Sequence, residues 1–141
     1  MEYRKFGDTY VVRIQRGEEI IEQLTALCKT ENIRLGSIDG LGAAGKVTVG
    51  CYNVEEKHYY KTTFEGGTFE ITSLTGNISE MNGEVYLHVH MSFAGEDGIG
   101  HGGHLNEAVI AATAEIFVRC LDGHVGRSHD EETGLNLYRF D

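Results

Sequence analysis

The sequence predicts an α+β fold in which a mainly antiparallel β-sheet is accompanied by one main helix. Most of the 141 residues fall into β-forming runs separated by glycine-containing turns, and 19 residues are glycine. One segment near the N-terminus has the periodicity of an amphipathic helix. No linker, repeat or low-complexity tract divides the chain. We therefore expect a single domain over residues 1–141.

The first part of the chain is predicted to contain a strand followed by the helix. Residues 3–14 are rich in aromatic and β-branched side chains, but Gly7 and Asp8 interrupt the run, so we expect a strand at about residues 9–14. Between residues 18 and 32 apolar side chains recur at helical spacing, at Ile20, Ile21, Leu24, Leu27 and Cys28. Glutamates occupy the first turn, where the helix dipole favours negative charge. We expect this helix to bury its apolar face.

Glycines punctuate the strands that follow the helix. Residues 33–53 contain a glycine cluster that lacks the spacing of a phosphate-binding loop, and glycines in strands typically mark bulges or close backbone approach. We expect further strands at residues 59–64 and 68–79, joined by a turn at Gly66 and Gly67.

The strongest turn signal in the sequence is the pair Asn82 and Gly83, which favours a tight β-hairpin. This hairpin would place residues 69–78 antiparallel beside residues 85–93. A last short strand is expected at residues 135–140.

The segment after residue 104 is compatible with two kinds of secondary structure. Its apolar residues have the spacing of a helix, at Leu105, Ala108, Val109, Ala112 and Ile116. Residues 113–121 are also rich in isoleucine, phenylalanine and valine, which is typical of a strand. The residues alone leave both readings open.

Charge and composition exclude some classes of function. The net charge is −10, from 12 lysines and arginines against 22 aspartates and glutamates. Binding to duplex DNA draws most of its affinity from basic groups that neutralise phosphates, so direct DNA binding is not expected. There is no apolar run near the roughly 20 residues that a membrane span needs, and residues 1–5 do not resemble a signal peptide. We therefore expect a cytoplasmic protein with no membrane contact, whose three cysteines are reduced.

The chemistry in this sequence is concentrated in YLHVHMSFAGEDGIGHGGHL, residues 86–105. Because strand side chains alternate between two faces, His88 and His90 point the same way, opposite to the apolar residues between and around them. A loop rich in glycine and acidic residues follows, and it can fold His101 or His104 back over this face. Three neutral imidazoles with an open fourth position form the ligand set of a catalytic-type zinc centre.

Several segments together resemble a known family. These are GGTFEITSLTGNIS (66–79), LHVHMSF (87–93), GGHLNEA (102–108), ATAEIFV (112–118) and ETGLNLY (132–138). In this order they resemble the plants-and-prokaryotes-conserved (PPC) domain, which occurs alone in bacteria and archaea and behind AT-hooks in plant nuclear proteins. The chain is similar to a stand-alone prokaryotic member.

The resemblance implies a strongly bent sheet beside the main helix, like that of acetolactate decarboxylase, and assembly as a homotrimer. It implies a helical turn after His104 and then a strand over about residues 109–121. It also implies zinc ligands at His88, His90 and His104, with His101 outside the motif. The AT-hook core is Arg-Gly-Arg-Pro, and a chain without proline does not contain it. If the histidines face away from the protomer's own core, either water or a neighbouring subunit covers the metal, and a trimer would supply such a subunit.

Two hypotheses about function follow. The first is a trimeric, zinc-binding interaction or assembly module with protein partners, related to DNA-binding proteins but without direct DNA contact. The second is a zinc enzyme of hydrolase or decarboxylase type that acts on a small anionic or carbonyl-containing molecule. In the enzyme, Glu70, Glu115 or His101 would be candidates for the acid or base. The sequence leaves open whether the protein is an enzyme.

Overall fold

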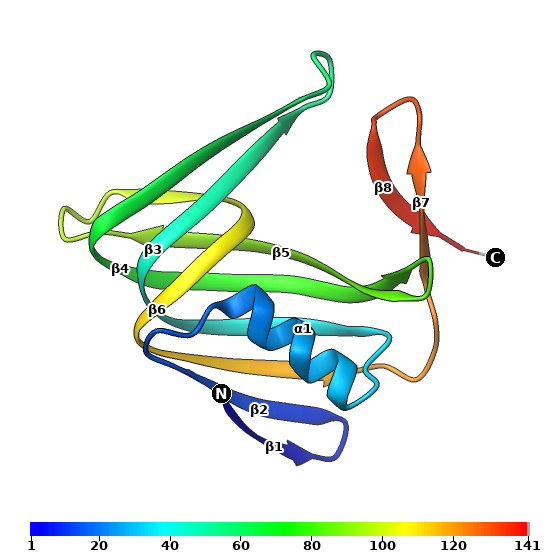
Figure 1. Ribbon diagram of the computed structural model, residues 1–141, viewed down its shortest axis with the longest axis horizontal. Helices are drawn as coiled ribbons and strands as arrows, with labels where there is room; N and C mark the ends of the chain where they lie inside the picture. The colour runs from blue at the N-terminus through cyan, green and yellow to red at the C-terminus, as the bar shows by residue number, and fades with distance from the viewer. Residues whose placement is uncertain (141) are drawn as a thin grey trace.

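The computed structural model describes residues 1–140 and contains eight strands and one helix (Figure 1). In chain order these elements are β1 (Glu2–Phe6), β2 (Thr9–Gln15), α1 (Ile20–Thr30), β3 (Gly36–Asn53), β4 (His58–Met81), β5 (Glu84–Ala94), β6 (Gly100–Cys120), β7 (Gly126–Asp130) and β8 (Leu135–Arg139). No helix in this described part has the length and apolarity that crossing a membrane requires.

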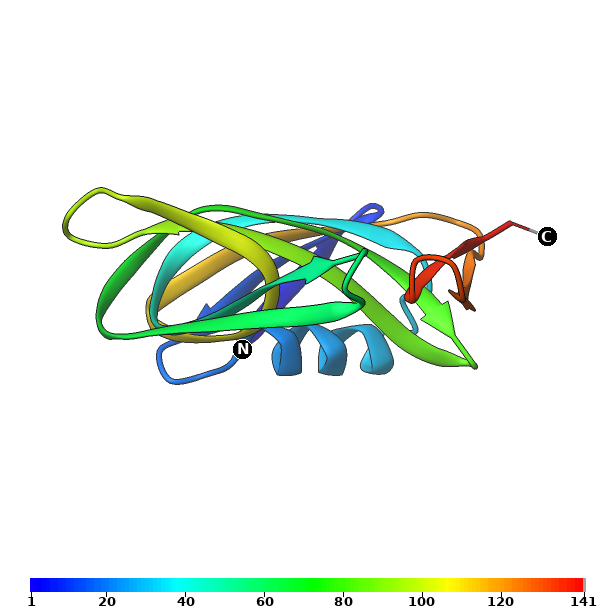
Figure 2. The ribbon, with the colours of Figure 1, turned by 90° about the horizontal axis from the view of Figure 1, so that it is seen from above.

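The strands form one sheet in the order β1-β2-β6-β3-β4-β7-β8, and β5 pairs with both β4 and β6. The long strand pairs are antiparallel, and the one parallel contact joins β4 to β7 at a single residue pair. The strands β3, β4 and β6 are long, with 18, 24 and 21 residues, and they bend along their length. Figures 1 and 2 show the sheet curving over itself. The predicted bent antiparallel sheet with one helix is confirmed.

Glycines allow the long strands to bend and to approach one another. The register between β3 and its neighbours shifts near Gly40 and Gly42, and again near Ala44. A methyl group at Gly36 would lie 2.5 Å from the carbonyl oxygen of Arg119 on β6. The prediction that this glycine cluster marks bulges and close approach is therefore confirmed.

The helix α1 packs on one face of the sheet (Figure 2). Glu19 caps its N-terminus, because its carboxylate accepts a hydrogen bond of 2.7 Å from the backbone N–H of Glu22. Its buried face consists of Ile20, Leu24, Leu27 and Cys28, as the periodicity predicts. These side chains join one continuous core with the inward-facing residues of β2, β5 and β6.

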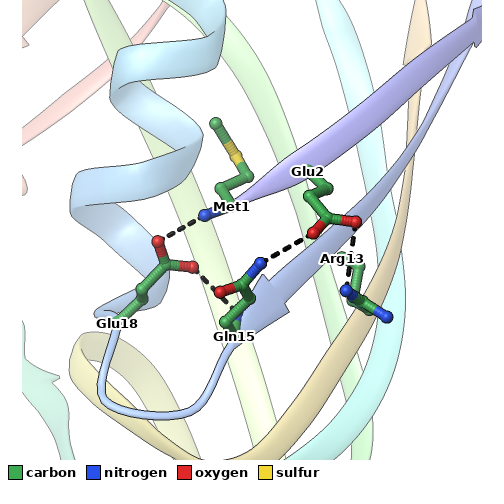
Figure 3. Close-up of polar contacts among 5 residues, drawn as sticks. All are labelled: Met1, Glu2, Arg13, Gln15 and Glu18. Atoms are coloured by element: carbon green, nitrogen blue, oxygen red, sulfur yellow. Dashed lines mark hydrogen bonds and ion pairs between the residues drawn. The ribbon is translucent and has the colours of Figure 1, made fainter.

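Polar contacts tie the first strand, β1, to the body of the molecule (Figure 3). The carboxylate of Glu2 accepts hydrogen bonds from Arg13 at 3.0 Å and from the Gln15 amide at 2.9 Å. The amino nitrogen of Met1 contacts Glu18, whose other oxygen accepts from the backbone N–H of Gln15 at 2.8 Å. The sequence predicts the first strand at residues 9–14 but not β1, which pairs with this strand along its whole length.

Two local predictions are wrong. Gly66 and Gly67 do not form a turn, because β4 continues through them, and the positive φ of 89° at Gly66 bends the strand without reversing it. There is also no helical turn after His104. Leu105 is buried and pairs with Val49, so β6 continues as one strand.

The Asn-Gly hairpin and the last strand are confirmed. Asn82 and Gly83 both have positive φ, at 54° and 80°, and they join β4 to β5. The strand β8 forms a hairpin with β7, and this hairpin stands beyond the ends of β4 and β5 (Figure 1). The strand β7 has no counterpart among the predicted strands.

Candidate metal centre

Strand pairing brings three histidines together on one face. His88 and His90 alternate along β5, and His90 lies directly opposite His104 on β6. Val89 and Met91, which point the other way, are buried in the core. The prediction that His88 and His90 share one face of their strand is therefore confirmed. The third member of the cluster is His104 rather than His101.

The spacing of the three rings suits a single metal ion. Their candidate ligand nitrogens all lie within 4.8 Å of one another, and the Nε2 atoms of His88 and His90 are 3.2 Å apart. The ring centroids are separated by 5.0–5.5 Å. In a tetrahedral site with metal–nitrogen bonds of about 2.05 Å, ligand nitrogens stand about 3.3 Å apart. The three histidines, which we call the triad, are thus arranged as a ligand set.

The electrostatic environment keeps His88 and His104 in their ligating form. Burial lowers the pKa of His88, and nearby His90 and Arg127 lower it further. Burial also lowers the pKa of His104 to about 4, with smaller effects from the other two triad rings. A metal binds the neutral imidazole, so a lowered pKa reduces competition by protons near neutral pH. The residues present therefore fit a metal ion.

Two glycines set the position of His104. A methyl group at Gly103 would lie 2.7 Å from the carbonyl oxygen of Gly50 on β3, and one at Gly102 would lie 2.8 Å from that of Met91 on β5. Neither position has room for a side chain, because β6 is held between two strands here. This close approach explains why the residues before His104 are both glycine.

A second set of residues contacts and supports His104. The ring of Tyr59 meets the His104 ring edge-on, with centroids 6.1 Å apart. The side chain of Asn106 donates hydrogen bonds to the Tyr59 hydroxyl at 2.6 Å and to the His104 carbonyl at 3.0 Å. Gly50 makes space for this tyrosine, since a methyl group there would lie 2.2 Å from the ring. None of these three supporting residues is predicted from the sequence, and only Asn106, two positions after His104, offers a signal.

An arginine from the C-terminal hairpin lies beside the triad. Arg127, on β7, donates a hydrogen bond of 3.0 Å to Asn77, the residue directly opposite His88 on β4. Its guanidinium stacks on the ring of Tyr86, two residues before His88, at 4.6 Å. Arg127 is not predicted from the sequence, because a lone arginine about 40 residues beyond the histidine motif gives no signal of proximity.

The acid or base candidates from the sequence do not join the triad. His101 lies opposite Phe93 on β5, on the other face of the hairpin, and its ring contacts Phe64 with centroids 4.6 Å apart. There it borders an open cavity of about 600 Å³ that is separate from the triad. Glu70 and Glu115 are exposed and lie outside the cluster of metal-ligating side chains found in residues 1–140.

Several solved structures are similar to this chain over nearly its whole length. A candidate DNA-binding protein from Bacteroides thetaiotaomicron is 39% identical, with a TM-score of 0.96 over 99% of this chain and 96% of the other. A metal-containing protein from Archaeoglobus fulgidus is 31% identical, with a TM-score of 0.89 over 99% and 97%. A plant- and prokaryote-conserved protein from Pyrococcus horikoshii is 33% identical, with a TM-score of 0.87 over 99% and 95%.

The expected likeness to acetolactate decarboxylase is present at the level of the fold. The enzyme from Bacillus subtilis is 16% identical, with a TM-score of 0.54 over 83% of this chain and 54% of the enzyme. At this identity the likeness shows a shared fold and carries no argument about chemistry.

The family follows from a direct match. No functionally curated protein matches the sequence. The family model described as the Plants and Prokaryotes Conserved (PCC) domain matches residues 1–122, which include the entire triad and its supporting residues but not the β7–β8 hairpin. Because this match covers far more than half of the chain, the protein belongs to the Plants and Prokaryotes Conserved domain family.

Proposed function

We propose that the protein is a stand-alone, zinc-binding assembly module that works as a homotrimer. The observation that carries this proposal is the convergence of His88, His90 and His104 on the outward face of the β5–β6 hairpin. Three outward-facing imidazoles contribute little to the protomer's own core, so their placement is better explained by a ligand than by packing.

Zinc is the metal that this donor set favours. Imidazole suits zinc and several other transition metals, whereas calcium and magnesium prefer oxygen ligands, and the cluster contains no carboxylate. The relative from Archaeoglobus fulgidus is described as metal-containing, which supports a metal at this site without naming the element.

The trimer would cover the triad. His90 is exposed and the other two triad rings are partly buried, so a neighbouring subunit has access to the site. Ligands on a surface shared by subunits would couple metal binding to assembly. Protein partners and a cytoplasmic location stay predictions.

Direct binding to DNA is not part of this proposal. The relative from Bacteroides thetaiotaomicron is described as a candidate DNA-binding protein, but this chain has a net charge of −10. An electrophoretic mobility-shift assay with random duplex DNA at low salt tests this point, and we expect no shift.

A zinc-dependent enzyme of hydrolase or decarboxylase type is the second candidate. The observation that favours it is the number of ligands, since three imidazoles leave a fourth position on a tetrahedral metal open to a small molecule. When bound, zinc would lower the pKa of a bound water or polarise a carbonyl group. Among the groups near the triad, Tyr59, Asn77 and Arg127 would bind and orient the molecule.

The test is elemental analysis combined with light scattering on protein purified without a metal-affinity tag. We expect one zinc per chain in the wild type and none in the double variant His88→Ala/His90→Ala. The matched control is His58→Ala/His129→Ala, which removes two exposed histidines elsewhere and should keep the metal.

The same samples separate the two functions. For an assembly module, loss of zinc should lower the measured mass from that of a trimer. For an enzyme, the trimer should persist while hydrolysis or decarboxylation of small substrates is lost. Wild-type protein that contains no metal, even after dialysis against zinc, would contradict both candidates.

A further inference from the structure

We propose that the metal centre binds a small carboxylate and that Arg127 is the residue that recognises it. This inference rests on the proposed metal centre and names the class of ligand for its open position. It is carried by a buried arginine beside the triad that forms no ion pair with a carboxylate in the described structure.

Arg127 is held in a defined position. It is 8% exposed, and its guanidinium lies between two aromatic rings, Tyr86 at 4.6 Å and Tyr138 at 4.3 Å. Its Nε donates to the hydroxyl of Ser79 at 2.8 Å, and its Nη1 donates to the carbonyl oxygen of Asn136 at 2.8 Å. With the bond to Asn77 at 3.0 Å, the side chain is anchored at three atoms.

All of these partners are neutral. Within residues 1–140 no carboxylate forms an ion pair with Arg127, although the protein carries 22 acidic side chains. A buried charge without a counter-charge is costly, and proteins normally pair it or keep it for a ligand. The contrast with Arg34 is direct, since that more exposed side chain pairs with Glu80 at 2.7 Å.

The Arg127 guanidinium lies over the same face of the sheet as the triad. Asn77, which receives the Nη2 bond, is the cross-strand partner of His88, and directly opposite residues place their Cβ atoms about 5 Å apart. Tyr86 lies on the same face of β5 as His88, two residues earlier. The guanidinium therefore sits on the same surface as the triad, one residue pair away from it.

The chemistry of the two groups is complementary. A guanidinium has five N–H donors, of which three are used here, and its flat fork matches a carboxylate. An open position on a metal held by neutral imidazoles also accepts an anionic oxygen. A carboxylate-bearing molecule of a few atoms would place one end at the metal and would be attracted by Arg127.

The test uses the full chain loaded with Co²⁺, whose visible spectrum reports changes in coordination. Acetate is the anionic probe, and acetamide is its neutral counterpart of the same shape. In the wild type we expect acetate to change the spectrum with saturation. In Arg127→Gln the dissociation constant of acetate should rise roughly tenfold to a hundredfold, while that of acetamide should not change.

Two further variants separate charge recognition from a structural role. Arg119→Gln removes the same charge from an exposed arginine on β6 and should leave acetate binding unchanged. Asn77→Asp gives Arg127 a carboxylate at hydrogen-bond distance, so it should support the hairpin but weaken acetate binding. If Arg127→Gln does not fold, Asn77→Asp alone carries the test.

The outcomes distinguish this inference from the proposed metal centre. Failure of Co²⁺ to bind would contradict the metal centre itself. Normal Co²⁺ binding with wild-type acetate affinity in Arg127→Gln, or in Asn77→Asp if the first variant does not fold, would overturn this inference alone. An equal loss of acetate and acetamide affinity would also overturn it, because it would assign Arg127 a structural role only.

Discussion

Acidification should destabilise the metal-free protein through His104. The folded environment lowers the pKa of this imidazole to about 4, whereas its ordinary value is 6.5. Between these two pH values the unfolded chain binds a proton at His104 and the folded chain does not. The free energy of unfolding therefore falls as the pH falls from 6.5 towards 4. The contribution of His104 to this free energy is fully present above pH 6.5.

The size of the effect follows from the two pKa values. Their difference of about 2.5 corresponds to roughly 3.4 kcal/mol. His104 is only partly buried, so screening by solvent reduces the expected loss to about 2 kcal/mol. The pKa of His88 is lowered as well, which acts in the same direction.

The assay is urea unfolding in the presence of a chelator at pH 7.5 and pH 4.5. Between these two pH values we expect the free energy of unfolding to fall by about 2 kcal/mol more in the wild type than in His104→Gln. Carboxylates titrate equally in both proteins, so their contribution cancels. His58→Gln, which alters an exposed histidine away from the triad, should behave as the wild type. Equal losses in wild type and His104→Gln would show that His104 does not cause this pH dependence.

Three further predictions concern the frame around the triad. Gly103→Ala places a methyl group 2.7 Å from a carbonyl oxygen on β3, so the free energy of unfolding should fall by about 1–3 kcal/mol and the zinc content should fall as well. The control Gly67→Ala, whose methyl group meets no atom within 4 Å, should be neutral in the same denaturation and metal assays. Tyr59→Phe removes the 2.6 Å hydrogen bond from Asn106 and should lower stability by about 1 kcal/mol in urea unfolding, without loss of the metal. Zinc at a hundredfold excess over its dissociation constant should stabilise the wild type by about 2.7 kcal/mol, measured as a rise in melting temperature that chelator reverses, and should not shift the double-histidine variant of the triad.

The sequence was informative where one local rule determines the structure. Alternation along a strand places His88 and His90 on one face whatever the rest of the fold does. Helical spacing with glutamates in the first turn predicts α1, and the Asn82-Gly83 pair predicts the β4–β5 hairpin. Each of these signals involves residues within a few positions of one another.

The errors arise where tertiary contacts override a local signal. Gly66 and Gly67 resemble a turn, but pairing with β3 on both sides of them keeps β4 extended. Leu105 fits a helical pattern, yet its burial opposite Val49 on β3 fixes it in a strand. Arg127 was not predictable as a neighbour of the triad, because β7 reaches it only through the three-dimensional path of the chain.

The position of the triad follows from the point where β5 changes neighbours. In the described chain, β5 pairs with β4 along its length, but with β6 only from His90 to Ala94. His90 and His104 are therefore held rigidly between paired strands, while His88 lies at the boundary. The end of β5 near Glu84 has no β6 neighbour, and at this end the β7–β8 hairpin places Arg127 over the face of the sheet that carries the triad. A site at such a boundary combines fixed ligand geometry with access for a ligand, and this combination supports the proposal that the three outward-facing imidazoles serve binding rather than packing.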